Sequence, residues 1–204
     1  YIDGTSVGSV SNSTNFISGN FAIGLNSYAG EWPGSFKISD FNITKDFARY
    51  TANFTPPTAP LSSSGSSLHI KGTDASILDK SQSSNDLTLF GNTTGSTTQV
   101  KFADTKSMYF DGTGYVRVED LGIGPLVTNE GFTIETWVNP TTALSSGNRA
   151  IFGLNKISNG DNVIVFTGME GGAIYYAHAD YWTTSTNIPE NEWSHVAVVV
   201  VGTS

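Results

Sequence analysis

Carboxylate side chains are the first residues in this chain that could do chemistry. Retaining hydrolysis of a glycosidic bond requires two carboxyl groups about 5–5.5 Å apart across the sugar. Glu135 stands alone on its predicted strand, and Glu190 and Glu192 follow Pro189, which places them in a turn. We therefore predict that the last two are solvated turn charges and that the chain has no catalytic carboxylate pair.

Histidine offers no stronger case for catalysis. The three histidines are His69, His178 and His195, and only His178 has a nearby acid in sequence, Asp180, in a predicted loop. A lone His-x-Asp is weak evidence for a catalytic triad, and the sequence lacks the Walker loop of phosphate-binding proteins. Nucleophilic catalysis and phosphate binding are therefore not expected.

Aspartates in turns could bind calcium, which prefers carboxylate and carbonyl oxygens. Two loops supply such oxygens, 74–86 and 111–114, but neither has the spacing of an EF-hand. We predict that calcium, if bound, is held by Asp111 with the carbonyl of Gly112 or Gly114. The alternative is that Asp111-Gly112 only forms a tight hairpin turn.

Tryptophan and tyrosine in loops could bind carbohydrate, because sugars stack on aromatic faces while polar groups bind their hydroxyls. Trp137 and Trp193 lie in predicted strands and are expected in the core. Two other tryptophans lie in predicted loops, where they either bind sugar or cap an open end of the core. The candidate carbohydrate-binding residues are Asp180, Tyr181 and Trp182, followed by Tyr28 and Trp32.

The composition limits the classes of protein and partner. Of 204 residues, 38% are hydrophobic and 14% charged, so solubility depends on Ser, Thr, Asn and Gly. Aromatic residues make up 12%, which is too many for a disordered chain. The net charge of −8 and the absence of a basic run make nucleic acid an improbable partner. The absence of cysteine excludes disulfides and thiol chemistry, and no apolar run is long enough to insert in a membrane.

The elements that must position these residues are short strands, centred on the segment 131–140. Aromatic and β-branched residues occupy both faces of this segment, so we predict a strand buried on both sides. Segment 36–43 alternates with a phase change near Asp40, which predicts a bulge. Segment 108–118 reads as a hairpin and 45–50 as one helical turn. Strand signals recur about every 8–12 residues, which predicts an all-β sandwich or barrel. Further strands are expected at 21–25, 68–71, 87–90, 150–154, 163–166, 173–177 and 193–201.

The segments "GFTIETWVNP" and "NEWSHVAVVVVGTS" resemble the first half of a laminin-G-like, concanavalin A-like lectin/glucanase sandwich domain. The segments "YIDGTSVGS" and "SFKISDFNITKDFARYTANFTPPTAPL" resemble the second half. The resemblance implies a two-sheet antiparallel jelly roll, often with calcium at its rim beside a turn such as "FDGTGYV". The Glu-x-Asp-x-x-Glu pattern of the related glycoside hydrolases is absent.

The two halves occur in swapped order. Residues 1–60 resemble the C-terminal half, 61–67 form a Ser/Gly connector, and 68–204 resemble the N-terminal half. Either the halves close into one permuted domain, or the chain is one period of a tandem array. A single closed sandwich requires Tyr1 to lie beside the strand 196–201 and the strands 68–71 and 36–43 to pair.

The resemblance implies a non-catalytic binding or adhesion module, with a glycan or host cell surface and neighbouring copies as partners. The segments "FARYTANFTPPTAPL" and "SMYFDGTGYVRV" are similar to repeated modules of marine bacteriophage fibre and virion-surface proteins. We therefore expect an extracellular or virion-surface location. The alternative is a purely structural repeat, decoration or filament subunit without ligand, and a glycan hydrolase is disfavoured by the missing carboxylate pair.

Overall fold

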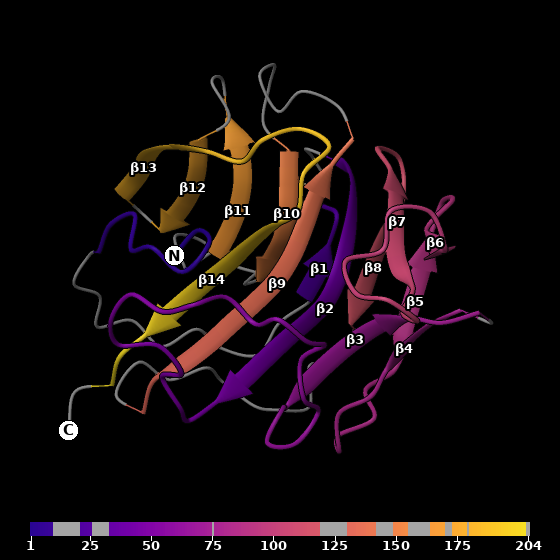
Figure 1. The fold of residues 1–204 in the computed structure, drawn as a ribbon, viewed down its shortest axis with the longest axis horizontal. Coiled ribbons are helices and arrows are strands. Elements are labelled where there is room, and N and C mark those ends of the chain that lie inside the picture. The colour runs from indigo at the N-terminus through magenta and orange to yellow at the C-terminus, as the bar shows by residue number, and fades with distance from the viewer. Residues whose placement is uncertain are drawn as a thin grey trace.

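The computed structural model describes residues 1–9, 21–25, 33–74, 76–118, 130–141, 149–154, 164–169, 173–178 and 180–202. For residues 154, 164–169, 173–178 and 180–187 the description covers the backbone alone. All regular structure in these residues is β-strand, arranged in two packed antiparallel sheets (Figure 1). The predicted all-β, two-sheet sandwich is confirmed, and the described residues contain no helix that could span a membrane.

Sheet I has the strand order β14-β9-β2-β3-β4, and β7 also pairs with β2 and with β6. Its strands are β2 (Ser35–Lys45), β3 (Leu68–Gly72), β4 (Ile77–Asp79), β6 (Thr94–Ser96), β7 (Ser107–Asp111), β9 (Phe132–Pro140) and β14 (Ser194–Val200). The predicted central strand β9 is buried along its whole length. It lies between β14 and β2, which explains its hydrogen bonding on both edges.

Sheet II has the order β13-β12-β11-β10-β1-β8-β5. Its strands are β1 (Phe21–Ile23), β5 (Leu87–Phe90), β8 (Tyr115–Val118), β10 (Arg149–Leu154), β11 (Ile164–Met169), β12 (Ala173–His178) and β13 (Asp180–Asn187). The short strand β1 is internal and joins β10 to β8, so it holds the two halves of this sheet together.

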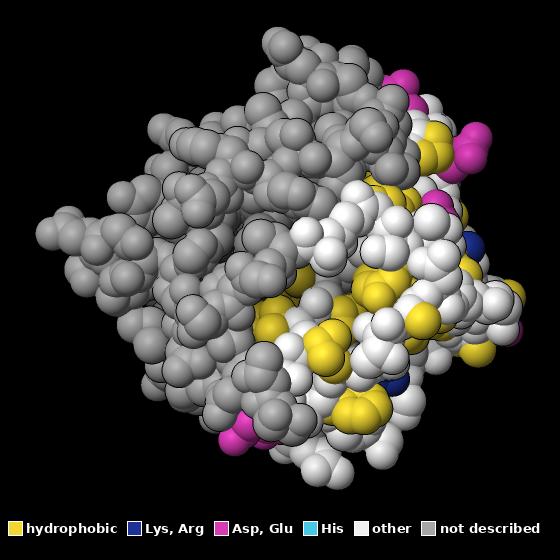
Figure 2. Space-filling model, turned by 90° about the vertical axis from the view of Figure 1, so that its left-hand side faces the viewer, with side chains coloured by type: hydrophobic (Ala, Val, Ile, Leu, Met, Phe, Trp, Pro, Cys, Tyr) yellow, Lys and Arg dark blue, Asp and Glu magenta, His cyan; other side chains and the backbone are white. Residues whose placement is uncertain are grey.

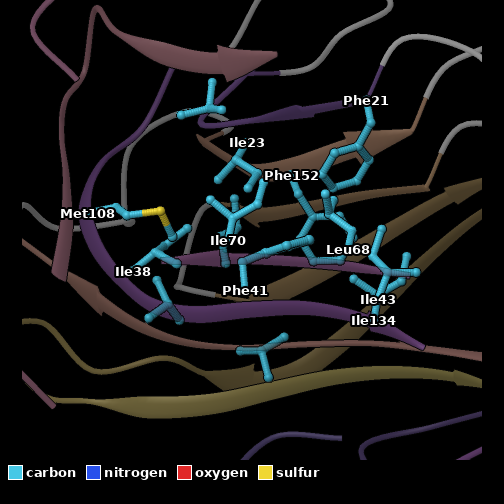
Figure 3. Packing of buried hydrophobic residues seen from close by; sticks show 14 of the residues in the cluster. Phe21, Ile23, Ile38, Phe41, Ile43, Leu68, Ile70, Met108, Ile134 and Phe152 are labelled. Atoms are coloured by element: carbon cyan, nitrogen blue, oxygen red, sulfur yellow. The ribbon is translucent and has the colours of Figure 1, made fainter. Parts of the chain in front are cut away.

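The core lies between the sheets and consists of aromatic and branched aliphatic side chains (Figure 3). Phe41 contacts Phe21 and Phe152 across the layers, with ring centroids 5.2 and 5.4 Å apart. All three rings are fully buried. Burying one side chain of this size contributes about 1.5–3 kcal/mol. Because apolar residues alternate along the strands, burying this face rather than the other gains that contribution many times over, which selects it as the inner face.

The phase change predicted near Asp40 is a bulge in β2. The pairing of β2 with β9 shifts between Ser39 and Asn42, and Asp40 has a left-handed φ of 55°. An extra residue at this point lets Ile38 and Phe41 both enter the core despite their odd spacing. The bulge also turns the Asp40 carboxylate into a buried position.

The structure contradicts the hairpin predicted from the sequence. Segment 108–118 is not a hairpin, because β7 belongs to sheet I and β8 to sheet II. Met108, Phe110, Val116 and Val118 are all fully buried in one core, so the turn 111–114 carries the chain from one layer to the other. The alternating pattern is the same for a hairpin and for such a crossover, which is why the sequence could not distinguish them.

The predicted helical turn at 45–50 is also absent. Lys45 ends β2, and the following residues lie in an irregular segment over the outer face of sheet I. The Thr133 hydroxyl donates to the Phe47 carbonyl and accepts from the Arg49 amide, at 3.2 and 2.8 Å. These contacts with the sheet replace the hydrogen bonds that a helical turn would have made internally.

Residues 1–60 and 68–204 contribute to the same two sheets. Tyr1 lies beside β14, where its amino group donates to the Ala197 carbonyl at 2.8 Å and Ile2 pairs with Val196. Strand β2 pairs with β3 through Asn42 and its neighbours, as one closed sandwich requires. In Figure 1 the indigo β1 and purple β2 lie between strands of later sequence. The swapped order of the halves relative to the family stays a prediction.

The two tryptophans expected in the core differ in burial. Trp137 is 5% exposed, as predicted. Trp193 is only half-buried and lies one residue before β14, in the turn that contains the exposed Glu190 and Glu192. The prediction of a buried strand position for Trp193 is therefore wrong, because β14 begins one residue later than the apolar pattern suggested.

Candidate functional site at the ends of β5 and β8

Asp111 organises the turn between β7 and β8. Its Oδ1 accepts hydrogen bonds from the Thr113 hydroxyl, the Thr113 amide and the Gly114 amide, at 2.7, 2.8 and 3.1 Å. Its Oδ2 accepts from the Asn92 side-chain amide at 2.9 Å. The bonds from Thr113 come first among the causes that lower the Asp111 pKa to about 2, so the carboxylate is ionised throughout the neutral range.

Two turns meet at this point because glycine allows their backbones to approach closely. Gly112 has a φ of +90°, which an L-residue adopts only with strain. A Cβ at Gly114 would collide with the Thr93 hydroxyl and the Phe90 carbonyl. The chain therefore needs a residue without a side chain here to bring Asn92 within hydrogen-bonding distance of Asp111.

An aromatic pair and a guanidinium lie directly beside these turns. Phe90 and Tyr115 are opposite each other on β5 and β8, and their rings stack with centroids 4.3 Å apart and planes 10° apart. The Arg117 guanidinium carbon lies 4.9 Å from the Phe90 centroid and 5.5 Å from the Tyr115 centroid. All three side chains are half-buried and lie on the outward side of sheet II, since Val116 and Val118 face the core.

Together these groups form one polar and aromatic surface, which we call the β5–β8 end. It consists of Phe90, Asn92, Asp111, Tyr115 and Arg117. It offers aromatic surface, an ionised carboxylate, a side-chain amide and a guanidinium within one edge of the sheet. Such a set can hydrogen-bond hydroxyl groups and contact an apolar ring at the same time.

Sequence reasoning found Asp111, Gly112 and Gly114 but missed Phe90, Asn92 and Arg117. The signal was present in the strand pattern: "LTLF" and "YVRV" each place an outward residue at alternate positions. What the sequence could not supply was the pairing of β5 with β8, which are separated by two other strands in the chain.

The fit of this turn to calcium is limited. It provides one carboxylate, and both oxygens of that carboxylate already accept hydrogen bonds. Among the residues whose side chains the structure describes, no three His, Cys, Asp or Glu residues gather into a possible metal site. In the other predicted calcium loop, the Asp79 oxygens accept from His69, Ser81 and Asn85, so they serve to shape that loop.

The leading carbohydrate candidates lie in a strand instead of the predicted loop. Asp180, Tyr181 and Trp182 open β13, and His178 ends β12, directly opposite Asp180. The antiparallel pairing of β12 with β13 extends the edge of sheet II and draws these residues into it. Their aromatic and Thr-rich sequence, "DYWTTSTN", suits such an edge strand.

The register distinguishes the two aromatic positions of β13. By pairing and alternation, the core-side positions are Ile23, Phe152, Phe166, Gly168, Ile174, Tyr176 and Trp182. In the backbone register, Trp182 thus falls at a core-side position and Tyr181 at an outward one. The two alternatives for Trp182, sugar binding and closure of the core, stay predictions. Tyr28 and Trp32, the second pair of candidates, lie outside the described residues.

A second polar cluster lies under the segment 46–61 on the outer face of sheet I. Glu135 is 1% exposed and accepts from the Tyr50 hydroxyl at 2.8 Å. Its Oε2 lies 3.2 Å from His195 Nε2, and its Oε1 forms an ion pair at 2.9 Å with Arg49 Nε, without the geometry of a hydrogen bond. Burial and the negative charge of Glu135 raise the Tyr50 pKa. Because the acid and the histidine are buried, this cluster has a structural role.

Asp40 forms a similar closed cluster beside the bulge. It is 3% exposed, and its Oδ1 lies 2.8 Å from Lys71 Nζ and 3.3 Å from His69 Nε2. Burial opposes ionisation of Asp40, but the hydrogen bonds from His69 and Lys71 outweigh it and lower its pKa. Both carboxylates on this face are therefore fixed by cations and closed to substrate.

Comparison with known proteins supports the fold class. A family model described as Concanavalin A-like lectin/glucanases superfamily matches residues 110–204. The resemblance stated from the sequence is thus confirmed over that segment, and the two-sheet sandwich is consistent with the concanavalin A-like fold. No match was found among curated proteins or among solved structures.

Proposed function

We propose that this chain is a non-catalytic binding module that recognises saccharides. A laminin-G-like sandwich fits a binding module, and domains of this kind are generally non-catalytic. The observation that carries the proposal is the β5–β8 end, where stacked Phe90 and Tyr115 adjoin Arg117, Asn92 and the ionised Asp111. This combination of ring surface and hydrogen-bonding groups suits a sugar.

The acidic residues support a role without catalysis. Glu135 and Asp40 are buried in ion pairs, while Glu190 and Glu192 are exposed in a turn. Asp46 and Glu130 are an exposed carboxyl pair, but they hydrogen-bond to each other, which leaves no room for a sugar between them. Hydrolases also occur in this fold class, so the fold alone does not decide the function. The arrangement of the acidic residues in this chain favours binding.

Other parts of the proposal rest on the sequence. The β13 residues Asp180, Tyr181 and Trp182, with Tyr28 and Trp32, would extend the saccharide surface. Calcium would join at Asp111 with the Gly112 or Gly114 carbonyl. The partner would be a glycan on a host cell surface, at an extracellular or virion-surface location, without nucleic acid or membrane insertion. On the described part of the face in Figure 2, which is turned away from the β5–β8 end, hydrophobic side chains are spread among white atoms with few charged side chains.

A second candidate is a structural repeat within a larger assembly. The observation in its favour is that Tyr1 and Ile2 pair with β14 only near Val196 and Ala197. Val201, just beyond that strand, is 58% exposed. A neighbouring copy could pair along the remaining edge of β14 and complete sheet I from outside.

A glycan array with and without calcium distinguishes the two functions. We expect the chain to bind a defined subset of saccharides, and Tyr115→Ala to lose at least about tenfold in affinity, since aromatic contacts of this kind dominate sugar binding. Tyr115→Phe should retain most of it. Phe47→Ala is the matched control, because Phe47 is 57% exposed and lies far along the chain from this end. Absence of any binding to the array would favour the structural repeat.

A further inference from the structure

Two lysines on the outer face of sheet I have no carboxylate partner. Lys37 on β2 is 8% exposed, and its Nζ donates to Gln99 Oε1 at 2.6 Å. Lys101 lies in the segment between β6 and β7, with its Nζ 3.6 Å from the centroid of the Trp137 ring. Among the described residues, neither Nζ lies within 4.0 Å of a carboxylate oxygen.

Three other cations among the described residues do have a carboxylate partner. Arg49, Lys71 and Lys106 each form an ion pair, with Glu135, Asp40 and Asp74 respectively. Burial lowers the pKa of both Lys37 and Lys101, and only Lys101 has a partial compensation, from Asp3. Partly desolvating two ammonium groups, of which only Lys101 has an acidic residue close enough to compensate in part, costs free energy that a bound anion would offset.

The residues around the two lysines lie next to one another on the outer face of sheet I. Lys37 is directly opposite Asn139 in the pairing of β2 with β9, and Trp137 lies two residues along the same face of β9. The segment that covers this face contacts both positions, because Gln99 accepts from Lys37 and Lys101, two residues later, lies over the Trp137 ring. Trp137 Nε1 and Asn139 Oδ1 are buried and have no hydrogen-bond partner. A hydroxyl group can accept from the first and donate to the second.

We propose that Lys37 and Lys101 bind the anionic group of an acidic saccharide, a carboxylate or a sulfate. The site lies on the outer face of sheet I and uses none of the residues of the β5–β8 end, although the inference rests on the proposed saccharide-binding function. Each ammonium group contributes a compact charge with free donors, which suits either anion. Because the protein carries a net charge of −8, binding must depend on these local contacts and weaken at high salt.

The test uses four probes: polygalacturonate, dextran sulfate, neutral dextran and inorganic sulfate. Binding is followed by calorimetry and by tryptophan fluorescence, since Lys101 contacts the Trp137 ring. We expect at least one polyanion to bind at about 0.1 M salt and to be released at about 1 M, while neutral dextran does not bind at this site. Lys101→Gln and Lys37→Gln should each reduce the affinity at least about tenfold.

Lys80→Gln is the matched control, because Lys80 is an exposed lysine outside this cluster. Equal loss in this variant, unchanged binding in Lys101→Gln, or absence of polyanion binding by the unaltered chain would each overturn the inference. Binding of inorganic sulfate alone would contradict the saccharide assignment. Binding of polygalacturonate alone would identify a carboxylate as the preferred anion, and binding of dextran sulfate alone would identify a sulfate ester.

Circular dichroism and thermal unfolding establish that each variant is folded. If Lys101→Gln keeps the array binding of neutral saccharides, the proposed function stands even where this site fails.

Discussion

The buried cluster around Glu135 and the open turn around Asp111 use their carboxylates in opposite ways. Glu135 is neutralised by Arg49 and hydrogen-bonded by Tyr50, under a segment that covers it. Asp111 accepts mainly from backbone and hydroxyl groups of its own turn, and no cation pairs with it among the described residues. The Glu135 contacts attach a covering segment to the sheet, whereas the ionised Asp111 lies at the surface, where a ligand can reach it.

The difference shows why burial has to be considered before chemistry is assigned. A carboxylate beside a histidine and a tyrosine, as at Glu135, resembles a catalytic group in composition. Its 1% exposure excludes a substrate, while the less conspicuous Asp111 adjoins exposed Asn92 and Thr113. Removal of each group should therefore affect stability in one case and binding in the other.

The largest expected effect is on folding, from Trp137→Ala. Trp137 is buried, and the change removes an indole that contacts Phe102 and Lys101 as well as the sheet. We expect a loss of about 3–5 kcal/mol in the free energy of unfolding. Urea denaturation measures it. Trp193→Ala, at a half-buried position, should cost clearly less, and equal losses would contradict the burial difference.

Glu135→Gln tests the closed cluster directly. The amide keeps the shape but leaves the Arg49 guanidinium without the carboxylate charge that compensates it. We expect a loss of about 3 kcal/mol, near the lower end for a broken buried pair because Arg49 is partly exposed. Glu190→Gln, in the exposed turn, should stay within about 0.5 kcal/mol. A Glu135→Gln variant as stable as the parent would contradict the structural role of this cluster.

Acid should weaken the closed face through Asp40. Its pKa in the folded chain is below the ordinary value of 3.8, so its contribution to stability is complete above pH 3.8. That contribution is lost as the pH falls from there through the folded pKa, because the unfolded chain binds the proton first. Unfolding curves between about pH 2 and 6 should show this loss. In Asp40→Asn the corresponding part of the pH dependence should vanish, and an unchanged profile would contradict the assignment.

The smallest stability effect is expected at the open turn. Asp111→Asn should leave the melting temperature close to that of the parent, because the residue lies at the surface. If calcium binds at Asp111, millimolar calcium should raise the parent's melting temperature relative to chelator and should not raise that of Asp111→Asn. An unchanged parent melting temperature would count against a calcium site of useful affinity.

The sequence by itself determined the class of fold and most of its strands. Alternating apolar residues fixed the faces of segments such as 36–43 and 132–140, and a phase change located the bulge at Asp40. These features are local, since burial of every second side chain needs only the period of a strand. Of the five residues of the β5–β8 end, the sequence identified Asp111 alone, through its Asp-Gly turn.

Tertiary structure decided which strands meet and which polar groups stay open. Only the sheets show that β7 and β8 belong to different layers, that β5 brings Phe90 to Tyr115, and that β13 includes Trp182. Only the position of the covering segment in the folded chain explains why Glu135 is buried while Asp111 lies at the surface. The physical reason is that pairing between distant strands and coverage by distant loops depend on the total burial of the folded chain, which no local pattern encodes.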